Sequence, residues 1–241
     1  MKLIWVVALR ELRSFFDSLT AYILLVIFLG LSGFFTWIYG SDVFLMGQAS
    51  LKPFFGVAYW TLFFFIPAIT MRTIAEEKRT GTIELLMTKS LSDWQLVLGK
   101  YLSCLLLIII ALVCTFPFYF TVWKLGPVDH GSVLCGYLGL VLMSSAYISI
   151  GIFASSITSN QIVSFLLSLL IGVFFLIIFQ ALSTSFTGFL GTIFQYLSIS
   201  EHFDSISRGV LDSRDITYFL SITFISLLLA EYNLVKRNTV N

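Results

Sequence analysis

Charged side chains that could do chemistry concentrate in one part of the sequence, residues 72–100. Two acidic residues stand there directly before two basic ones, and a glycine follows. The residues that we single out are Glu76, Glu77, Lys78, Arg79, Gly81, Thr82, Glu84, Leu85 and Leu86. Carboxylate, ammonium and guanidinium groups form charge-assisted hydrogen bonds and ion pairs. The segment is therefore a candidate contact surface for a soluble partner. The alternative is that it only carries the positive charge typical of inner membrane loops.

Cysteine and histidine, which often hold metals or carry redox chemistry, are scattered through the sequence. Cys104, Cys114 and Cys135 lie in apolar runs without a C-x-x-C pair, which is typical of small buried side chains. His130 and His202 are isolated in segments that we expect to be loops. We therefore predict no catalytic residues and no metal site.

A nucleotide site is also not expected in this chain. The Gly99-Lys100 pair invites comparison with the P-loop pattern G-x-x-x-x-G-K-[ST]. However, Trp94 stands where the first glycine is needed, and Tyr101 stands where serine or threonine is needed. Any ATP that drives this protein must be bound by another polypeptide.

Composition shows what must hold the charged segment in place. The chain has 241 residues, of which 58% are hydrophobic and only 11% are charged, against about 25% in a soluble domain. A net charge of +1 gives no broad basic face for nucleic acid. The surplus apolar surface needs a lipid bilayer as its solvent.

The apolar runs predict an all-α integral membrane protein with six transmembrane helices in a single domain, residues 1–241. A span needs about 20 mostly apolar residues, and backbone polar groups in lipid must bond within a helix. Period-two alternation, the mark of a membrane barrel, does not occur in these runs. The predicted spans are residues 19–39, 54–71, 95–123, 133–157, 162–182 and 216–235.

The distribution of basic residues predicts the orientation. With both termini cytoplasmic, ten of the 14 Lys and Arg residues fall inside. These are Lys2, Arg10, Arg13, Arg72, Lys78, Arg79, Lys89, Lys100, Lys236 and Arg237. The four outside are Lys52, Lys124, Arg208 and Arg214.

Three segments outside the spans have helical patterns of their own. Residues 1–18 predict an amphipathic helix in the cytoplasmic headgroup layer, with a plain continuation of the first span as the alternative. In the cytoplasmic loop 72–94, Gly81 is expected to end a helix and Thr82 to cap a short second one over residues 83–87. The loop 183–215 predicts two short helices that dip into the outer leaflet or cap the bundle.

Within the spans, two features predict local geometry. Pro67 and Pro117 should kink the second and third spans. In the fifth span Ser164, Ser168 and Gly172 recur every four residues, a stripe that allows close helix contact and is our candidate for a dimer interface. Chance scatter of small residues in a leucine-rich helix is an equal alternative.

The run from Glu76 to Leu86, followed by Gly99-Lys100, resembles the signature of ABC transporter permeases of the type-2 family (ABC-2). The resemblance implies that this loop forms the coupling helix that docks onto the ATP-binding subunit, and the family also has the six spans, interfacial helix and re-entrant helices. Further runs, among them those at 66–72, 151–155, 160–163 and 207–212, resemble the gliding-motility-associated permease subunit, the F component. Ser90 departs from that pattern, where proline is usual.

The resemblance implies a permease subunit in a bacterial inner membrane, an exporter that works as a homo- or heterodimer of permeases. Its ATP-binding partner would use the ATP and Mg²⁺, and this chain would bind no cofactor. A membrane anchor of a surface or motility complex, without transport, is the alternative. A secondary carrier is disfavoured because the spans contain almost no ionisable residues.

Overall fold

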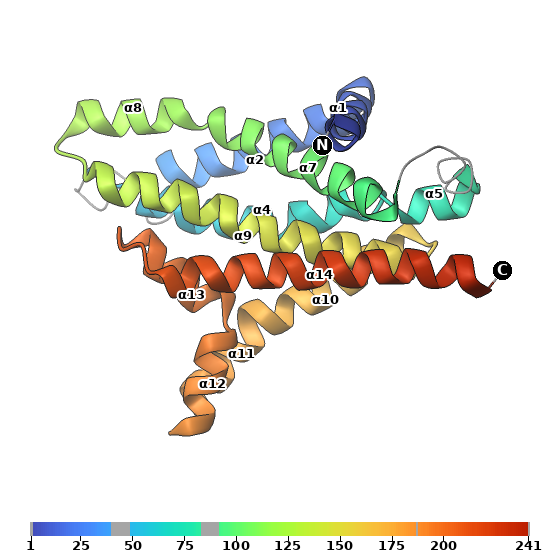
Figure 1. Cartoon of the computed structure of the whole chain (residues 1–241). Helices are drawn as coiled ribbons and strands as arrows, with labels where there is room; N and C mark the ends of the chain where they lie inside the picture. Colours follow the sequence, from blue (N-terminus) through green and yellow to red (C-terminus); the bar gives the residue numbers. More distant parts are fainter. Residues whose placement is uncertain (1, 40–48, 83–91, 187, 241) are drawn as a thin grey trace.

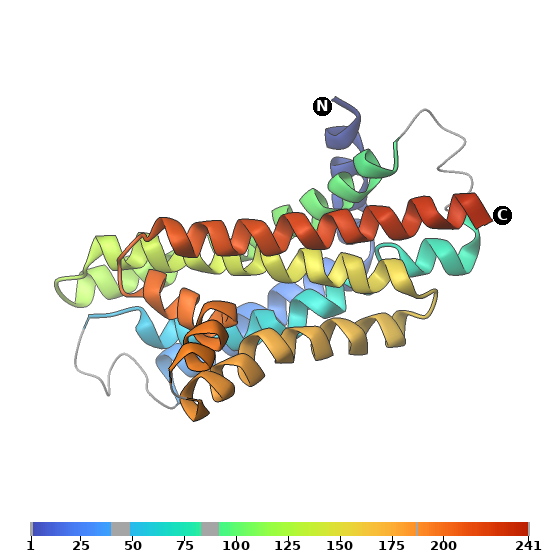
Figure 2. The same cartoon turned by 60° about the horizontal axis from the view of Figure 1, so that its bottom comes forward.

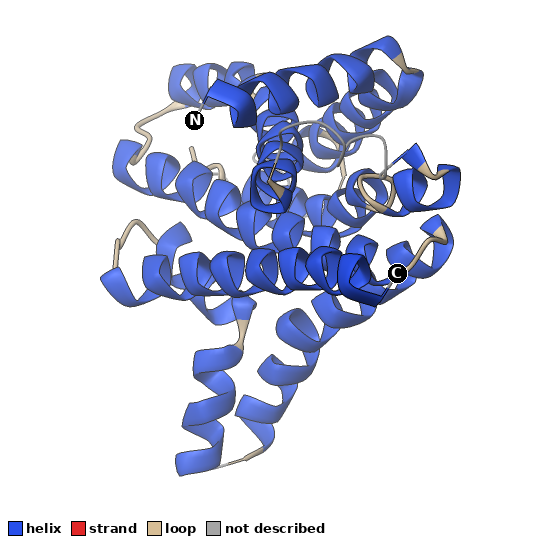
Figure 3. Ribbon diagram, turned by 45° about the vertical axis from the view of Figure 1, so that its right-hand side comes forward, coloured by secondary structure: helices blue, strands red, loops and turns tan. Residues whose placement is uncertain are grey.

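The computed structural model describes residues 2–39, 49–82, 92–186 and 188–240, and every regular element in this part is a helix (Figure 3). Six helical stretches are long and apolar enough to cross a membrane. They are α2 (Leu19–Trp37), α4 (Lys52–Thr70), α7 (Asp93–Val113) with α8 (Phe116–Leu125), α9 (His130–Ile157), α10 (Gln161–Val173) with η1 (Phe174–Ile178) and α11 (Phe179–Ser185), and α14 (Ser213–Val240). The all-α prediction with six membrane-length helices is confirmed.

Helix α9 forms the centre of the bundle, because α4, α7, α10, α13 and α14 pack against it. In its apolar window 72% of the residues are buried, against 22% in that of α2. Glycines on α9 allow close approach. An added Cβ at Gly136 would lie 2.4 Å from the Phe55 ring, and one at Gly151 would lie 2.1 Å from Thr70 Oγ1. Close packing around α9 therefore holds the bundle together.

The long helices run side by side and give the bundle two ends (Figure 1). Helix α5 (Ala75–Thr80) and the last turns of α14 lie at one end, which we call the α5 end. The outer part of α8 and the turn before α9 lie at the other, the α8 end. The two sites described below lie at these opposite ends.

Helix α1 (Lys2–Asp17) lies across the direction of the long helices and packs on α7 (Figures 1 and 2). Gly99 of α7 allows this contact, since an added Cβ there would lie 2.6 Å from Val7 Cγ1. Ser18 takes an extended conformation between α1 and α2. Helix α1 is therefore a separate element and not a continuation of the first span.

The two prolines act differently. The third span breaks between α7 and α8 at Cys114 and Thr115, and Pro117 stands in the first turn of α8, where its missing N–H costs nothing. This break is the predicted kink. Pro67 leaves α4 continuous, and the chain turns only at residues 71–74, just before α5.

The loop 183–215 contains the two short helices that its pattern predicts, α12 (Phe189–Leu197) and α13 (Ile199–Ser207). Helices α11 and α12 pack on each other and project from the bundle (Figure 1). His202 of α13 is buried, and its Nδ1 lies 2.6 Å from Asp215 Oδ1 on α14, while its Nε2 lies 3.1 Å from the Tyr196 carbonyl oxygen. The expectation that His202 is isolated in a loop is wrong, because it anchors α13 to the last span.

Candidate functional site

Helix α5 is the short charged helix that follows the second span. Its start is fixed by α9, since the backbone N–H groups of Ile74 and Ala75 donate to Ser155 Oγ at 3.1 and 2.9 Å. Its end is fixed by Gly81, whose φ of 72° lies in the left-handed region that favours glycine. The prediction that Gly81 ends this helix is confirmed. Four charges in six residues keep α5 outside the apolar part of the span.

A buried lysine joins α5 to two other helices. Lys100 of α7 is only 1% exposed, and its Nζ lies 2.7 Å from Glu77 Oε1 on α5 and 3.7 Å from Glu11 Oε2 on α1. Arg10 donates to Glu11 Oε1 at 2.8 Å. A buried ammonium group is tolerated only with such partners. We call Glu11, Glu77 and Lys100 the ion-pair cluster.

The environment of Glu77 makes it depend on Lys100. Burial raises the pKa of the Glu77 carboxyl, and the charge of Lys100 and its hydrogen bond oppose that rise. Glu77 Oε2 is buried without a hydrogen-bond partner among the described residues. A displacement that parts Glu77 from Lys100 would therefore leave Glu77 without its counter-charge and Lys100 with only the more distant Glu11.

A polar cavity of about 590 Å³ lies beside the cluster, between α1, the start of α2 and α5. Hydroxyl and charged side chains line it in roughly equal measure. They include Arg10, Glu11, Ser14, Ser18, Thr20, Arg72, Thr73, Glu76, Glu77, Thr80, Thr82 and Lys100. The cavity separates part of α5 from α1 beside the ion-pair cluster.

The other predicted residues of the charged segment divide into two groups. Lys78 Nζ donates to the Ser156 carbonyl oxygen, which fastens α5 to the end of α9. Arg79 is exposed, and its Nη2 lies 4.0 Å from Oε1 of Glu76, which is half-exposed at the edge of the cavity. Thr82 is exposed. Glu84, Leu85, Leu86 and the predicted helix over 83–87 lie outside the described residues.

The predicted dimer stripe lies inside the chain. Ser164 and Ser168 are buried, and an added Cβ at Gly172 would lie 2.9 Å from the Phe63 ring and 3.4 Å from that of Tyr147. Helix α10 uses these small residues to approach α4 and α9 of the same chain. The close helix contact is real, but its placement corrects the dimer prediction for Ser164, Ser168 and Gly172.

Sequence reasoning missed the central member of the cluster. Lys100 was considered as an inside charge and as part of a sequence signature, and no contact was predicted for Lys100, Glu11 or Ser155. A signal existed, because Lys100 follows Val97 and Leu98 inside an apolar helix that begins at Asp93. A lysine in such a place needs a buried acidic partner.

The arrangement offers ion pairs and hydrogen bonds that join a short charged helix to its neighbours. Among the described residues, no three His, Cys, Asp or Glu side chains come together as a metal site would require. The family model described as ABC-2 family transporter protein matches residues 11–234. No curated protein matches the chain. The match includes Glu11, Glu77 and Lys100.

Proposed function

Since the chain belongs to the ABC-2 family of transporter proteins and is a permease subunit of an ABC transporter, we propose that it is an exporter driven through α5. A separate ATP-binding subunit docks on the outward edge of α5 and on the loop that follows it. That subunit binds and hydrolyses ATP with Mg²⁺. This chain supplies the path through the membrane.

The observation that carries the proposal is the ion-pair cluster. Helix α5 is bound to α7 and α1 through Lys100 and to α9 through Ser155 and Ser156. A push on α5 therefore reaches α9 and α7 directly, and it reaches α1 through Lys100. To move a two-state bundle almost completely, the nucleotide state must favour one state by about 5 kcal/mol. Ion pairs and hydrogen bonds between helices transmit such a difference in free energy better than a connection without them.

The orientation follows from the same proposal. The α5 end faces the cytoplasm of a bacterial cell, both termini are inside, and α1 lies in the inner headgroup layer of the cytoplasmic membrane. Helices α12 and α13 then lie at the outer leaflet as re-entrant elements. Support comes from the ten basic residues assigned to the inside. The F-component subfamily of gliding-motility transporters fits the same sequence runs.

Six spans make half of a translocation path, so a second permease, identical or homologous, completes it. Because Ser164, Ser168 and Gly172 face inward, the partner needs another surface. The least covered spans are α2 and α10–α11, each with 22% of its apolar window buried. Their outward faces are our candidates for the dimer contact.

Labelling tests the orientation. In a cysteine-free background, Thr82→Cys should react with a membrane-impermeant maleimide only in inverted vesicles, and Ser50→Cys only in intact cells. Both positions carry small polar side chains at opposite ends of the bundle. Labelling of Thr82→Cys in intact cells would refute the proposal, because no ATPase could then reach α5.

Docking is tested in the assembled complex. Glu76→Arg with Arg79→Glu reverses two exposed charges and leaves the ion-pair cluster intact, so it should weaken co-purification of the ATP-binding subunit and its stimulation by the permease. Lys124→Glu at the far end is the control. A membrane anchor without transport would bind its partner yet leave ATP turnover unstimulated in every variant.

A further inference from the structure

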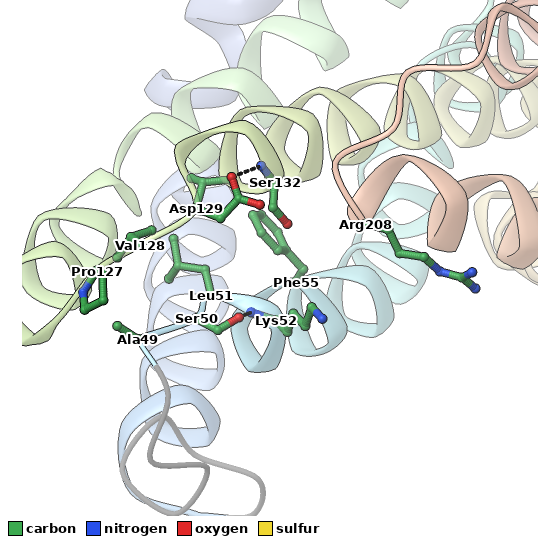
Figure 4. A pocket seen from close by; sticks show the side chains of 11 residues that line it. Ala49, Ser50, Leu51, Lys52, Phe55, Pro127, Val128, Asp129, Ser132 and Arg208 are labelled. Atoms are coloured by element: carbon green, nitrogen blue, oxygen red, sulfur yellow. Dashed lines mark hydrogen bonds between the residues drawn. The ribbon is translucent and has the colours of Figure 1, made fainter.

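A second cavity, of about 500 Å³, lies at the α8 end, where α4 and α9 begin and α13 ends (Figure 4). Lys52 and Phe55 line it from α4, and Asp129 and Ser132 line it from the start of α9. Arg208 follows the end of α13 at the rim, and its side chain extends outward in Figure 4. The proposed coupling mechanism uses none of these residues.

A hydrogen bond joins α9 and α13, two of the helices that border this cavity. Ser132 Oγ donates to the Ser207 carbonyl oxygen at 3.0 Å, which fastens α9 to the last turn of α13. Gly209 has a φ of 93°, and an added Cβ would lie 3.3 Å from Ser132 Cα. Only glycine fits this close left-handed turn. The turn fixes the backbone of Arg208 at the rim.

The net charge of the side chains that line the cavity is positive. Lys52 and Arg208 are exposed, and neither forms an ion pair within 4.0 Å among the described residues. Asp129 caps α9, since its Oδ1 accepts from the backbone N–H groups of Gly131 and Ser132 at 3.0 and 3.3 Å, and its single negative charge stands against the two positive charges of the lining. Asp204, one turn before Arg208, acts on it only at longer range.

The floor of the cavity is apolar. Leu51, Phe55 and Val133 are 1%, 4% and 6% exposed. We propose that this cavity binds the anionic headgroup of an amphiphile, with its phosphate beside Lys52, Arg208 adding positive charge at the rim, and its apolar part against Leu51, Phe55 and Val133. A free phosphate ion would gain nothing from that floor.

The placement of the two cations supports an amphiphile of the outer leaflet. Outer loops of membrane proteins carry few basic residues. In the proposed orientation, on which this argument rests, two of the four outer basic residues line this one cavity. An anionic headgroup is the ligand that two basic residues at one cavity favour.

Binding of phosphatidylglycerol to the purified full chain in neutral detergent tests the proposal. Anisotropy of a tail-labelled phosphatidylglycerol reports its affinity, with phosphatidylcholine of the same tail as the zwitterionic comparison. Lys52→Gln with Arg208→Gln should weaken phosphatidylglycerol binding about 25-fold, since each basic side chain near an anionic headgroup contributes about a factor of five. Lys124→Gln with Arg214→Gln, also exposed basic residues near the α8 end, should change it less than about two-fold.

Equal losses in both double variants would mean general surface attraction and would overturn the proposal, as would no loss in either. Equal affinity for phosphatidylcholine in the unchanged protein would also overturn it. Displacement by inorganic phosphate at the concentration of the lipid would assign the site to a free anion instead. The assay contains no ATP-binding subunit, so its failure and a failure of the coupling proposal are separate results.

Discussion

The two ends of the bundle use charge in opposite ways. At the α5 end Lys100 is buried between Glu77 and Glu11, and charges from three helices satisfy one another within the chain. At the α8 end Lys52 and Arg208 are exposed beside a cavity, without an ion pair among the described residues. Paired buried charges suit the transmission of movement between helices, whereas unpaired exposed charges suit a ligand. The predictions below test this contrast, beginning with the largest effect.

Replacing Lys100 with Met should be the most damaging single change. It leaves Glu77 buried without a counter-charge and Glu11 with only Arg10 as its partner, and breaking such a buried pair costs about 3–5 kcal/mol. Thermal unfolding of the purified protein measures this loss. Lys100→Met with Glu77→Met should recover much of it, because both charges are then gone. A Lys100→Met protein as stable as the original would show that the cluster contributes nothing.

His202→Phe should cost about 2 kcal/mol at the α8 end. The change leaves the buried Asp215 carboxylate without its hydrogen bond, although the aromatic ring can still stack on Tyr218, whose centroid lies 4.0 Å away. The exposed His130, bonded to Tyr119, provides the control through His130→Phe. Equal stability of both variants would contradict the anchoring role of His202.

Gly151→Ala should destabilise the packing beneath the α5 end by about 1–2 kcal/mol. The added methyl group would meet Thr70 Oγ1, and overpacking of a tight helix contact is costly. Gly30→Ala is the matched control, since an added Cβ there meets nothing within 4 Å. The same thermal unfolding assay separates the two. If Gly151→Ala left the stability unchanged, the contact between α9 and Thr70 would have to accommodate an added methyl group without cost.

The pH dependence of coupling should reveal Glu77. Because burial raises the pKa of its carboxyl, Glu77 loses its proton at a higher pH than an ordinary glutamate does. Permease-dependent ATP turnover should therefore rise with pH as Glu77 loses its proton, at a higher pH than an ordinary glutamate would give. Glu77→Gln should remove this rise from the pH profile of turnover. The stability effect has the opposite sign. Below the ordinary pKa the protonated carboxyl costs nothing, and the cost of burying its charge appears as pH rises through the folded-state pKa.

The sequence predicts the apolar framework well, because span length and helix-breaking residues can be read locally. The six spans, the end of α5 at Gly81 and the break near Pro117 are of this kind. Contacts between distant segments are different. The pattern of Ser164, Ser168 and Gly172 shows that some helix comes close, but not that the helix belongs to the same chain.

Only the local part of the candidate site was predicted, because its other part depends on contacts between distant segments. The charged run that contains Glu77 stands out, but its link to Lys100 and Glu11 depends on how α1, α5 and α7 meet in space. The pairing of His202 with Asp215 likewise requires α13 to fold against α14. Buried polar pairs are set by tertiary contact, which periodicity does not encode.

The most direct test of the central claim is a charge-swap cycle at Glu77 and Lys100 in the complex with the ATP-binding subunit, reconstituted in liposomes. Permease-dependent ATP turnover is measured for Glu77→Lys, for Lys100→Glu and for the two together. We predict that each single change uncouples turnover while the double change restores a large part of it. Full stimulation by both single variants would contradict the account, because α5 would then drive the bundle without the Glu77–Lys100 link.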